Sequence, residues 1–275
     1  MKNHASGCFF DVYFCKKHIN IDIYYIYTAM ADYDTYSNYV GSIIDTNNLT
    51  GFKSNPKYVY MLEHVSTKYG REYLECILSQ TSITMDEIIA FCALNDSVGN
   101  PNKVEYKEHH ISASPTSLRY IFHAHLILTH MKAIGCVNAD VVEVGGGYGG
   151  LCISVHHFAS KYGVQLNSYR ICDLTNIIRL QKLYISSVMP ALNIEFADAS
   201  SFGANIDCTN MFPISNYCFS EISKENQASY VKNLFPKIAH GFIAWNNIPM
   251  YDFGFEKKVE PEVPNTGKMN KYVYF

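Results

Sequence analysis

Val141-Val142-Glu143-Val144-Gly145-Gly146-Gly147-Tyr148-Gly149-Gly150 is the stretch that decides the fold of this 275-residue chain. Its apolar first part predicts a strand, its glycines predict a turn, and the apolar run that follows, 151–163, predicts a helix. Glycines at 145, 147 and 149 or 150 allow positive φ and a close approach of the backbone to a ligand, at the N-terminus of a helix. The pattern therefore indicates a nucleoside cofactor site, and the alternative is a glycine turn without a ligand.

Two cofactor patterns overlap in this stretch. Gly145-x-Gly147-x-x-Gly150 fits a dinucleotide, whereas Glu143-x-Gly145-x-Gly147-x-Gly149 fits S-adenosylmethionine. We favour the second pattern because Glu143 occupies a strand position that a dinucleotide fold normally fills with an apolar residue. A buried acid requires a compensating partner. S-adenosylmethionine offers one, since its sulfonium and its α-amino group both carry positive charge.

From residue 141 onward, strand and helix patterns alternate. Strands are predicted at 141–144, 168–172, 192–196, 210–216 and 238–246, and helices at 150–162, 174–188 and 223–235. This alternation is typical of βαβ units with a parallel sheet. We therefore expect an α/β, Rossmann-like, mainly parallel sheet over residues 113–275.

The first 112 residues lack this alternation and are expected to form a mainly helical accessory region that covers the substrate. Residues 57–80 predict one helix that begins after Pro56 and presents an apolar face. Thr84 and Glu87 form a capping box that predicts a second helix. The polar stretch 95–107 predicts a connector to the second domain.

The composition narrows the classes of function. A hydrophobic content of 48% with 17% charged residues is typical of a globular protein with a large core, and no apolar run is long enough to cross a bilayer. The net charge of −3, without clustered Lys or Arg, argues against a nucleic-acid partner. Nine cysteines without a CxxC pair, and an N-terminus without a signal-peptide pattern, favour a cytoplasmic protein.

Two acids follow predicted strands where a nucleoside would bind. Asp173 stands 23 residues after Gly150 (173 − 150 = 23), where a carboxylate can accept bonds from both ribose hydroxyls. The alternative is that it caps the next helix, and the two roles are not exclusive. Asp198, or its neighbour Ala199, could contact the adenine edge, and a plain turn aspartate is the alternative.

Residues for the chemistry itself are less clearly marked. Seven histidines lie between 109 and 157, but their spacing does not form a metal-binding pattern, so we expect no metal site and mostly packing roles. His156 or His157 could still lie near the substrate. Glu221, just after the fourth predicted strand, is a candidate base, or a carboxylate that only stabilises a helix start. The chain has no Gly-x-Ser-x-Gly elbow and no P-loop lysine.

Several separated segments resemble one family, the sugar O-methyltransferases, within the S-adenosylmethionine-dependent methyltransferases of Rossmann-like fold. These segments are Ser114-Pro115-Thr116 with Leu118-Arg119-Tyr120, VEVGGGYGGL, YRICDL followed by LQKLY, SNYCFSEIS, Trp245-Asn246, and the tail from Glu262 to Asn270. The resemblance covers about residues 50 to 275. Thr175 departs from it, because a proline is expected at that position.

The resemblance implies methyl transfer to a hydroxyl of a sugar, on a nucleotide-sugar or a glycan, and a homodimer is one assembly compatible with it. The expected cofactor-binding residues are Glu143, Gly145, Gly147, Gly149, Asp173, Leu174, Asp198, Ala199 and Asn216. The expected substrate residues are Arg119, Tyr148 and Tyr217, and the expected catalytic residues are Glu221 and His157. An NAD-dependent sugar oxidoreductase or epimerase, and a catalytically silent scaffold, remain as alternatives.

Overall fold

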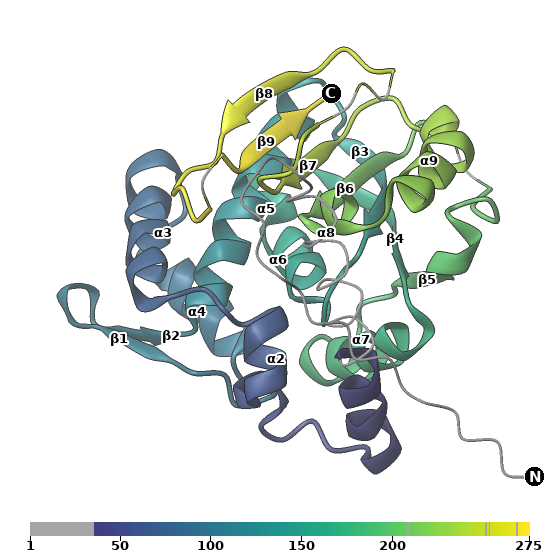
Figure 1. Cartoon of the computed structure of the whole chain (residues 1–275). Coiled ribbons are helices and arrows are strands. Elements are labelled where there is room, and N and C mark those ends of the chain that lie inside the picture. Colours follow the sequence, from purple (N-terminus) through teal and green to yellow (C-terminus); the bar gives the residue numbers. More distant parts are fainter. Residues whose placement is uncertain (1–35, 208, 251, 253, 268) are drawn as a thin grey trace, which may run out of the picture.

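The chain folds around a seven-stranded, mainly parallel β-sheet flanked by helices (Figure 1). The computed structural model describes residues 36–207, 209–250, 252, 254–267 and 269–275. The strands occur in the order β5-β4-β3-β6-β7-β9-β8, and only β9 runs against the others. Their bounds are β3 Asn138–Val144, β4 Gln165–Asp173, β5 Glu195–Asp198, β6 Phe212–Asn216, β7 Phe242–Trp245, β8 Lys258–Pro261 and β9 Lys271–Tyr274. The predicted α/β class is confirmed, and each of the five predicted strands overlaps an observed one.

The two faces of the sheet bury different side chains because successive residues of a strand point to opposite sides. In β3, Val141 belongs to the larger hydrophobic cluster, whereas Val142 and Val144 belong to the smaller one. The larger cluster contains side chains of α5 (Pro115–Ala133), α6 (Gly150–Ala159) and α7 (Thr175–Val188). The smaller cluster contains side chains of α8 (Cys218–Glu221) and α9 (Lys224–Asn233). Glu143 consequently points to the same face as Val141.

The N-terminal region contains η1 (Phe52–Ser54), α2 (Pro56–Met61), α3 (Thr67–Gln80), α4 (Met85–Asn95) and a hairpin of β1 (Val104–Tyr106) and β2 (Ile111–Ala113). The capping box of Thr84 and Glu87 is confirmed at the start of α4. The prediction of one helix over 57–80 is wrong. Leu62 leaves helical geometry at φ −131°, and the Ser66 hydroxyl accepts a bond from the Tyr69 amide, so a new helix begins there.

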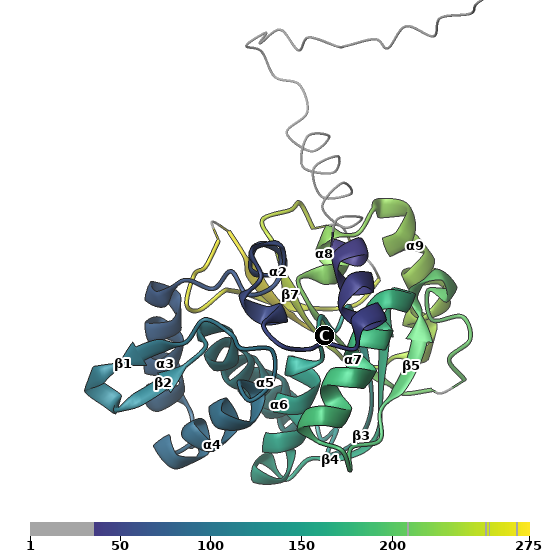
Figure 2. The same ribbon diagram turned by 90° about the horizontal axis from the view of Figure 1, so that it is seen from below.

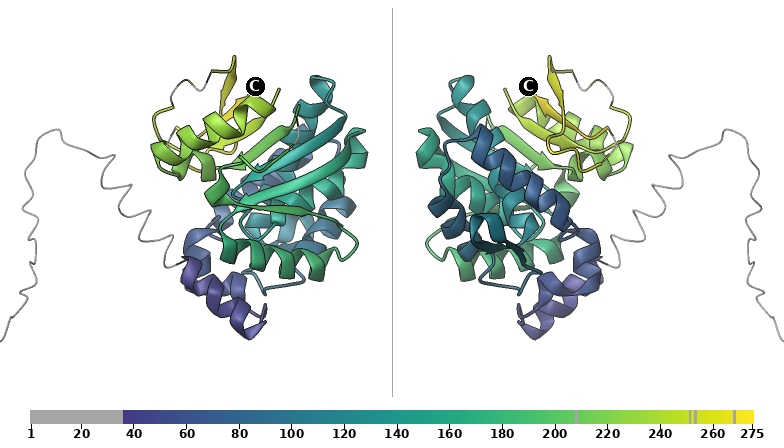
Figure 3. Two further views of the ribbon diagram at one scale, coloured as in Figure 1. Left: turned by 90° about the vertical axis from the view of Figure 1, so that its right-hand side faces the viewer. Right: turned by 90° about the vertical axis from the view of Figure 1, so that its left-hand side faces the viewer.

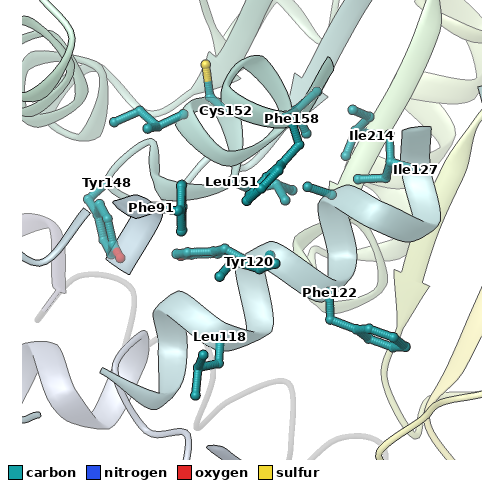
Figure 4. Packing of buried hydrophobic residues seen from close by; sticks show 14 of the residues in the cluster. Phe91, Leu118, Tyr120, Phe122, Ile127, Tyr148, Leu151, Cys152, Phe158 and Ile214 are labelled. Atoms are coloured by element: carbon teal, nitrogen blue, oxygen red, sulfur yellow. The ribbon is translucent and has the colours of Figure 1, made fainter. Parts of the chain in front are cut away.

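This region packs on the same face of the sheet as α5 and α6 and shares their core. Figure 4 shows Phe91 of α4 in one buried cluster with Tyr120 of α5 and with Tyr148 and Leu151 after β3. Residues 36–46 are helical and lie beside α7, where the Asn176 amide donates to the Ser37 hydroxyl (Figure 2). Figure 3 shows these residues, in purple, at the opposite end of the molecule from β8 and β9, in yellow. Within the described parts of the chain, no helix meets the length and apolarity that a membrane span requires.

The close contact of α3 with α5 gives a test of the fold. A Cβ at Gly70 would lie 2.1 Å from the Tyr106 hydroxyl oxygen and 2.9 Å from Pro115 Cβ. We expect Gly70→Ala to lower the free energy of unfolding by about 1–2 kcal/mol, because overpacking outweighs the roughly 1 kcal/mol that alanine gains in a helix. Gly41→Ala is the matched control, since its Cβ would meet only Asn176 Nδ2 at 3.7 Å. Urea titrations that find Gly70→Ala as stable as Gly41→Ala would contradict this packing.

Candidate functional site

The strand order places a topological switch point between β3 and β6. From β3 the chain continues to β4 and β5 on one side, and β6 and β7 extend the sheet on the other side. Ligands of open α/β sheets bind outside the carboxyl ends of the strands at such a point. A cavity of about 70 Å³ lies there, lined by Met61, Leu62, His64, Arg119, Tyr120, Glu143, Gly145, Gly146, Gly147, Leu151, Asn216, Tyr217 and Glu221. We call it the inner cavity.

The glycine loop after β3 forms the floor of the inner cavity. Gly145, Gly147 and Gly149 have φ of 77°, 55° and 99°, a region that side chains disfavour. A Cβ at Gly145 would lie 2.2 Å from Cys218 Sγ, so this glycine is required by packing. A Cβ at Gly147 would meet only Leu62, at 3.4 Å, and Tyr120. The face of the loop at Gly147 therefore lies open toward the cavity.

Glu143 is a buried acid in the wall of this cavity, only 1% exposed. The Tyr169 hydroxyl donates to its Oε2 at 2.8 Å, and among the described residues no cation pairs with it. Burial raises the pKa of Glu143 to about 8. Without a ligand the carboxyl is thus mainly protonated at neutral pH, and a bound cation would favour its ionised form.

Asp173, at the end of β4, holds the glycine loop. Its Oδ2 accepts bonds from the Gly146 amide at 2.9 Å and from Gln181 Nε2 at 2.8 Å, and its Oδ1 accepts from the Leu174 amide. Burial raises the pKa of Asp173 to about 6, against the effect of these donors. The carboxylate thus connects β4, the glycine loop and α7. It lies beside the inner cavity but does not line it.

Three other predicted cofactor residues lie away from the cavity. Leu174 is the N-cap residue of α7 and is 42% exposed. Asp198 caps the short helix η4 (Ala199–Ser201), because its Oδ1 accepts from the Ser200 amide at 2.9 Å. These residues follow β4 and β5, on the same sheet edge as the glycine loop, but none of them lines the inner cavity.

A second cavity of about 280 Å³ adjoins the first, and we call it the outer cavity. Its lining residues are His64, Val65, Tyr69, Arg119, Tyr217, Glu221, Asn246, Thr266 and Asn270. Four of them, His64, Arg119, Tyr217 and Glu221, also line the inner cavity. These four side chains therefore stand at the junction of the two cavities.

Tyr217 begins the short helix α8 at φ 67°, an unusual conformation for a residue with a side chain. Its amide donates to the Ala244 carbonyl at 2.8 Å, and its hydroxyl donates to Glu262 in the C-terminal tail. Glu262 also accepts from the Thr266 amide at 2.7 Å and from Asn270 Nδ2 at 3.2 Å. The tail that follows β8 is thereby folded into the wall of the outer cavity.

The polar side chains at the junction differ in charge. Arg119 is 7% exposed and lies 5.8 Å from the ring of Tyr217. Burial in the cavity wall and the nearby charge of Arg119 lower the pKa of His64 to about 4, so its imidazole is neutral at physiological pH. Glu221 accepts a bond from Asn246 Nδ2. The amide of Asn216 donates to His123 Nδ1 at 2.8 Å, which leaves its buried Oδ1 without a partner.

Two predicted residues are placed elsewhere. Tyr148, expected to face the substrate, is fully buried, and its hydroxyl accepts a bond from Asn95 Nδ2 at 3.1 Å in the N-terminal core. Its ring packs between Tyr120 and Tyr184 and lines neither cavity. His157, expected to be catalytic, packs on the ring of Phe91 and lines neither cavity. His156, considered beside it, donates from its Nδ1 to the Cys152 carbonyl at 2.8 Å and packs on Tyr169.

His64 and the tail residues are functional candidates that the sequence patterns missed. The single helix predicted over 57–80 includes His64, so the prediction gives this residue no place in a turn. Ser66-Thr67 is a helix-start signal that indicates a new helix after His64. In the part of the chain that the structure describes, no group of three His, Cys, Asp or Glu side chains could hold a metal ion.

The chain matches no protein-family model and no curated protein. Similar solved structures include magnesium protoporphyrin IX methyltransferase from Synechocystis PCC 6803 with bound S-adenosylmethionine, at 12% identity over 76% of this chain and 97% of that chain, with a TM-score of 0.41. LepI in complex with S-adenosylmethionine is 12% identical over 77% of this chain and 68% of that chain, with a TM-score of 0.42. CalS10, an amino pentose methyltransferase from Micromonospora echinaspora, is 13% identical over 51% of this chain and 57% of that chain, with a TM-score of 0.37. At these values the likeness concerns the backbone fold alone.

The buried acid gives a test of the site without any ligand. Because its pKa is about 8 in the folded chain and about 4.3 in an unfolded one, Glu143 makes the folded chain less stable as pH rises between these values. The parent chain should therefore lose stability from pH 5 to pH 8, whereas Glu143→Gln should not. We expect the difference in unfolding free energy between the two chains to change by a few kcal/mol in favour of the variant over this range. Unfolding free energies from urea titrations at both pH values measure the difference. An equal difference at both values would show that Glu143 titrates normally.

Proposed function

We propose that this chain is an S-adenosylmethionine-dependent methyltransferase that transfers a methyl group to a hydroxyl of a sugar, in a nucleotide-sugar or a glycan. One observation carries the proposal: a buried carboxyl without a cation and an open glycine loop share a cavity at the switch point of the sheet. A second, polar cavity adjoins this one and offers room for an acceptor.

The residues present fit the cofactor. Glu143 would face its positive charge, and Gly147 would admit it close to the backbone. Two buried acceptors beside the loop, Asn216 Oδ1 and Gln181 Oε1, have no protein partner and suit its amino and hydroxyl groups. S-adenosylmethionine, when bound, supplies an electrophilic methyl group. The carboxylate of Asp173 holds the loop from behind and, with Asp198 and Ala199, stays a candidate for the ribose and adenine side.

The outer cavity fits a polyhydroxylated acceptor. Its lining offers hydroxyl, amide, carboxylate and imidazole groups, with few apolar side chains. Its volume is near the lower end of the roughly 300–1,000 Å³ typical of ligand pockets. A sugar hydroxyl placed between Glu221 and His64 would have a proton acceptor within reach, and alignment with the methyl group would supply much of the rate enhancement. We assign to Glu221 the role of the base that accepts the hydroxyl proton. Residues 36–112 form the cover of the substrate site, and His64 belongs to this cover.

The alternatives have less support. An NAD-dependent oxidoreductase gives no role to the buried acid at Glu143, which would face an anionic cofactor. A silent scaffold would not require unpartnered polar atoms at the junction of two cavities. A cytoplasmic location and a homodimer belong to the proposal as well, and the nine cysteines without a CxxC pair favour the former.

Calorimetric titration separates the two cofactor classes. We expect S-adenosylhomocysteine to bind saturably and NAD to show no heat of binding. Gly147→Ala should weaken S-adenosylhomocysteine about 10-fold or more, since its Cβ projects toward the cavity. Gly163→Ala is the matched control, because its φ of 72° gives similar strain but a Cβ there meets nothing within 4 Å. Saturable binding of NAD, with no binding of S-adenosylhomocysteine, would contradict the proposal.

The base can be tested by turnover on a panel of nucleotide sugars and oligosaccharides. Glu221→Gln keeps the size and most bonding of the side chain but cannot take a proton, so we expect turnover to fall about 100-fold. Its affinity for S-adenosylhomocysteine should stay within about 2-fold of the parent value. His64→Gln is measured in parallel. Parent-level turnover by Glu221→Gln, with loss in His64→Gln, would move the role of base to His64.

A further inference from the structure

His123 is a fully buried histidine of α5 whose hydrogen bonds define its tautomer. Its Nε2 lies 3.3 Å from the hydroxyl oxygen of Tyr272, and that hydroxyl donates its only proton to the Val263 carbonyl at 2.9 Å. The hydroxyl can therefore only accept a bond from His123, so Nε2 carries a ring proton. Burial, with the nearby charge of Arg119, lowers the pKa of His123 to about 3, so the ring holds a single proton at neutral pH. Its Nδ1 is consequently an acceptor.

This tautomer fixes the side-chain amide of Asn216. The Nδ2 of Asn216 donates to Nδ1 of His123 at 2.8 Å. An inverted amide would place its oxygen against the lone pair of Nδ1, with no proton between them. The imidazole is itself held by the rings of Tyr73, Tyr217 and Tyr272, with ring centres 5.9, 6.0 and 5.6 Å away. Because the oxygen and the nitrogen of an amide point in different directions, Oδ1 of Asn216 is turned away from His123.

Asn216 ends β6 and lines the inner cavity, and its buried Oδ1 has no hydrogen-bond partner among the described residues. A buried acceptor without a partner is costly unless a ligand supplies the donor. We propose that His123 is a positioning residue: it makes Asn216 present its Oδ1, and not its amino group, to a hydrogen-bond donor of the ligand in the inner cavity. The orientation of the amide is independent of the proposed function, whereas the identity of that ligand as S-adenosylmethionine rests on it.

The tautomer can be tested without any ligand. Nuclear magnetic resonance spectra that correlate the ring protons with the ring nitrogens distinguish the two neutral tautomers, and the signals lost in His123→Asn identify those of His123. We expect the Nε2–H form, unchanged between pH 5 and pH 8 because the pKa of His123 lies well below this range. The Nδ1–H form would overturn the inference, since Asn216 would then accept from the ring and turn its amino group away from it.

Calorimetric titration with S-adenosylhomocysteine tests the consequence for binding. Asparagine can place its side-chain oxygen near the Nδ1 position of a histidine, so His123→Asn should keep the affinity within about 3-fold of the parent value. Glutamine places its polar group near the Nε2 position instead, so His123→Gln should weaken binding about 10-fold or more. His125→Gln is the matched control, because His125 lies on the same helix, bonds the Tyr162 hydroxyl and lines neither cavity.

A double variant separates positioning from a general structural role. If His123 acts only through Asn216, His123→Gln should cause no further loss of affinity when Asn216→Ala is already present. Thermal melting verifies that each variant is folded. Losses that add in the double variant, or parent-level binding by His123→Gln, would contradict the inference. If the parent chain does not bind S-adenosylhomocysteine, the proposed function fails, and the tautomer of His123 still decides the orientation of the amide.

Discussion

The site depends on a buried lysine. Lys53 is fully buried, and its Nζ donates to the Asn95 carbonyl at 2.6 Å and to the Tyr184 hydroxyl at 2.8 Å. The same nitrogen lies 4.1 Å from the ring centre of Tyr148. Burial lowers the pKa of Lys53 to about 8, so the ammonium is held at a cost that these contacts must offset. Through it the N-terminal region, the glycine loop and α7 share one polar centre inside the core.

This centre explains why the glycine loop needs a tyrosine. Gly147 leaves its side of the loop open toward the inner cavity, so the loop must be fixed by other residues. Tyr148 does this by packing between Tyr120 and Tyr184, with ring centres 5.8 Å and 4.8 Å away. Asp173 fixes the loop again at Gly146. The N-terminal region therefore supports the glycine loop, because it contributes both Lys53 and Asn95.

Much of the sheet and of its glycine loop could be predicted from the sequence, because periodicity and glycine spacing are local signals. Glu143 is a buried acid on β3, as the sequence predicts, and it lies in the wall of the inner cavity. Tyr148 is predicted to face the substrate but is buried, because the pattern of a loop does not say to which side a side chain points. Its direction is fixed by the distant Lys53 and Asn95. The position of His64 could not be predicted, because it lies in a break between α2 and α3 and the apolar periodicity continues on both sides of this break. The bond of Glu262 to Tyr217 and the bond of Arg119 to the Leu62 carbonyl join residues more than 40 positions apart, which no local pattern encodes.

The residues that line only one of the two cavities come largely from different parts of the chain. Five residues line only the outer cavity: Val65, Tyr69, Asn246, Thr266 and Asn270. Val65 and Tyr69 come from the segment around the start of α3, Asn246 follows β7, and Thr266 and Asn270 belong to the C-terminal tail. None of them belongs to the glycine loop. Under the proposed function, substitutions at these five residues would change acceptor recognition and leave the cofactor's contacts in place. The acceptor would then vary through the outer wall, while the residues of the glycine loop stay the same.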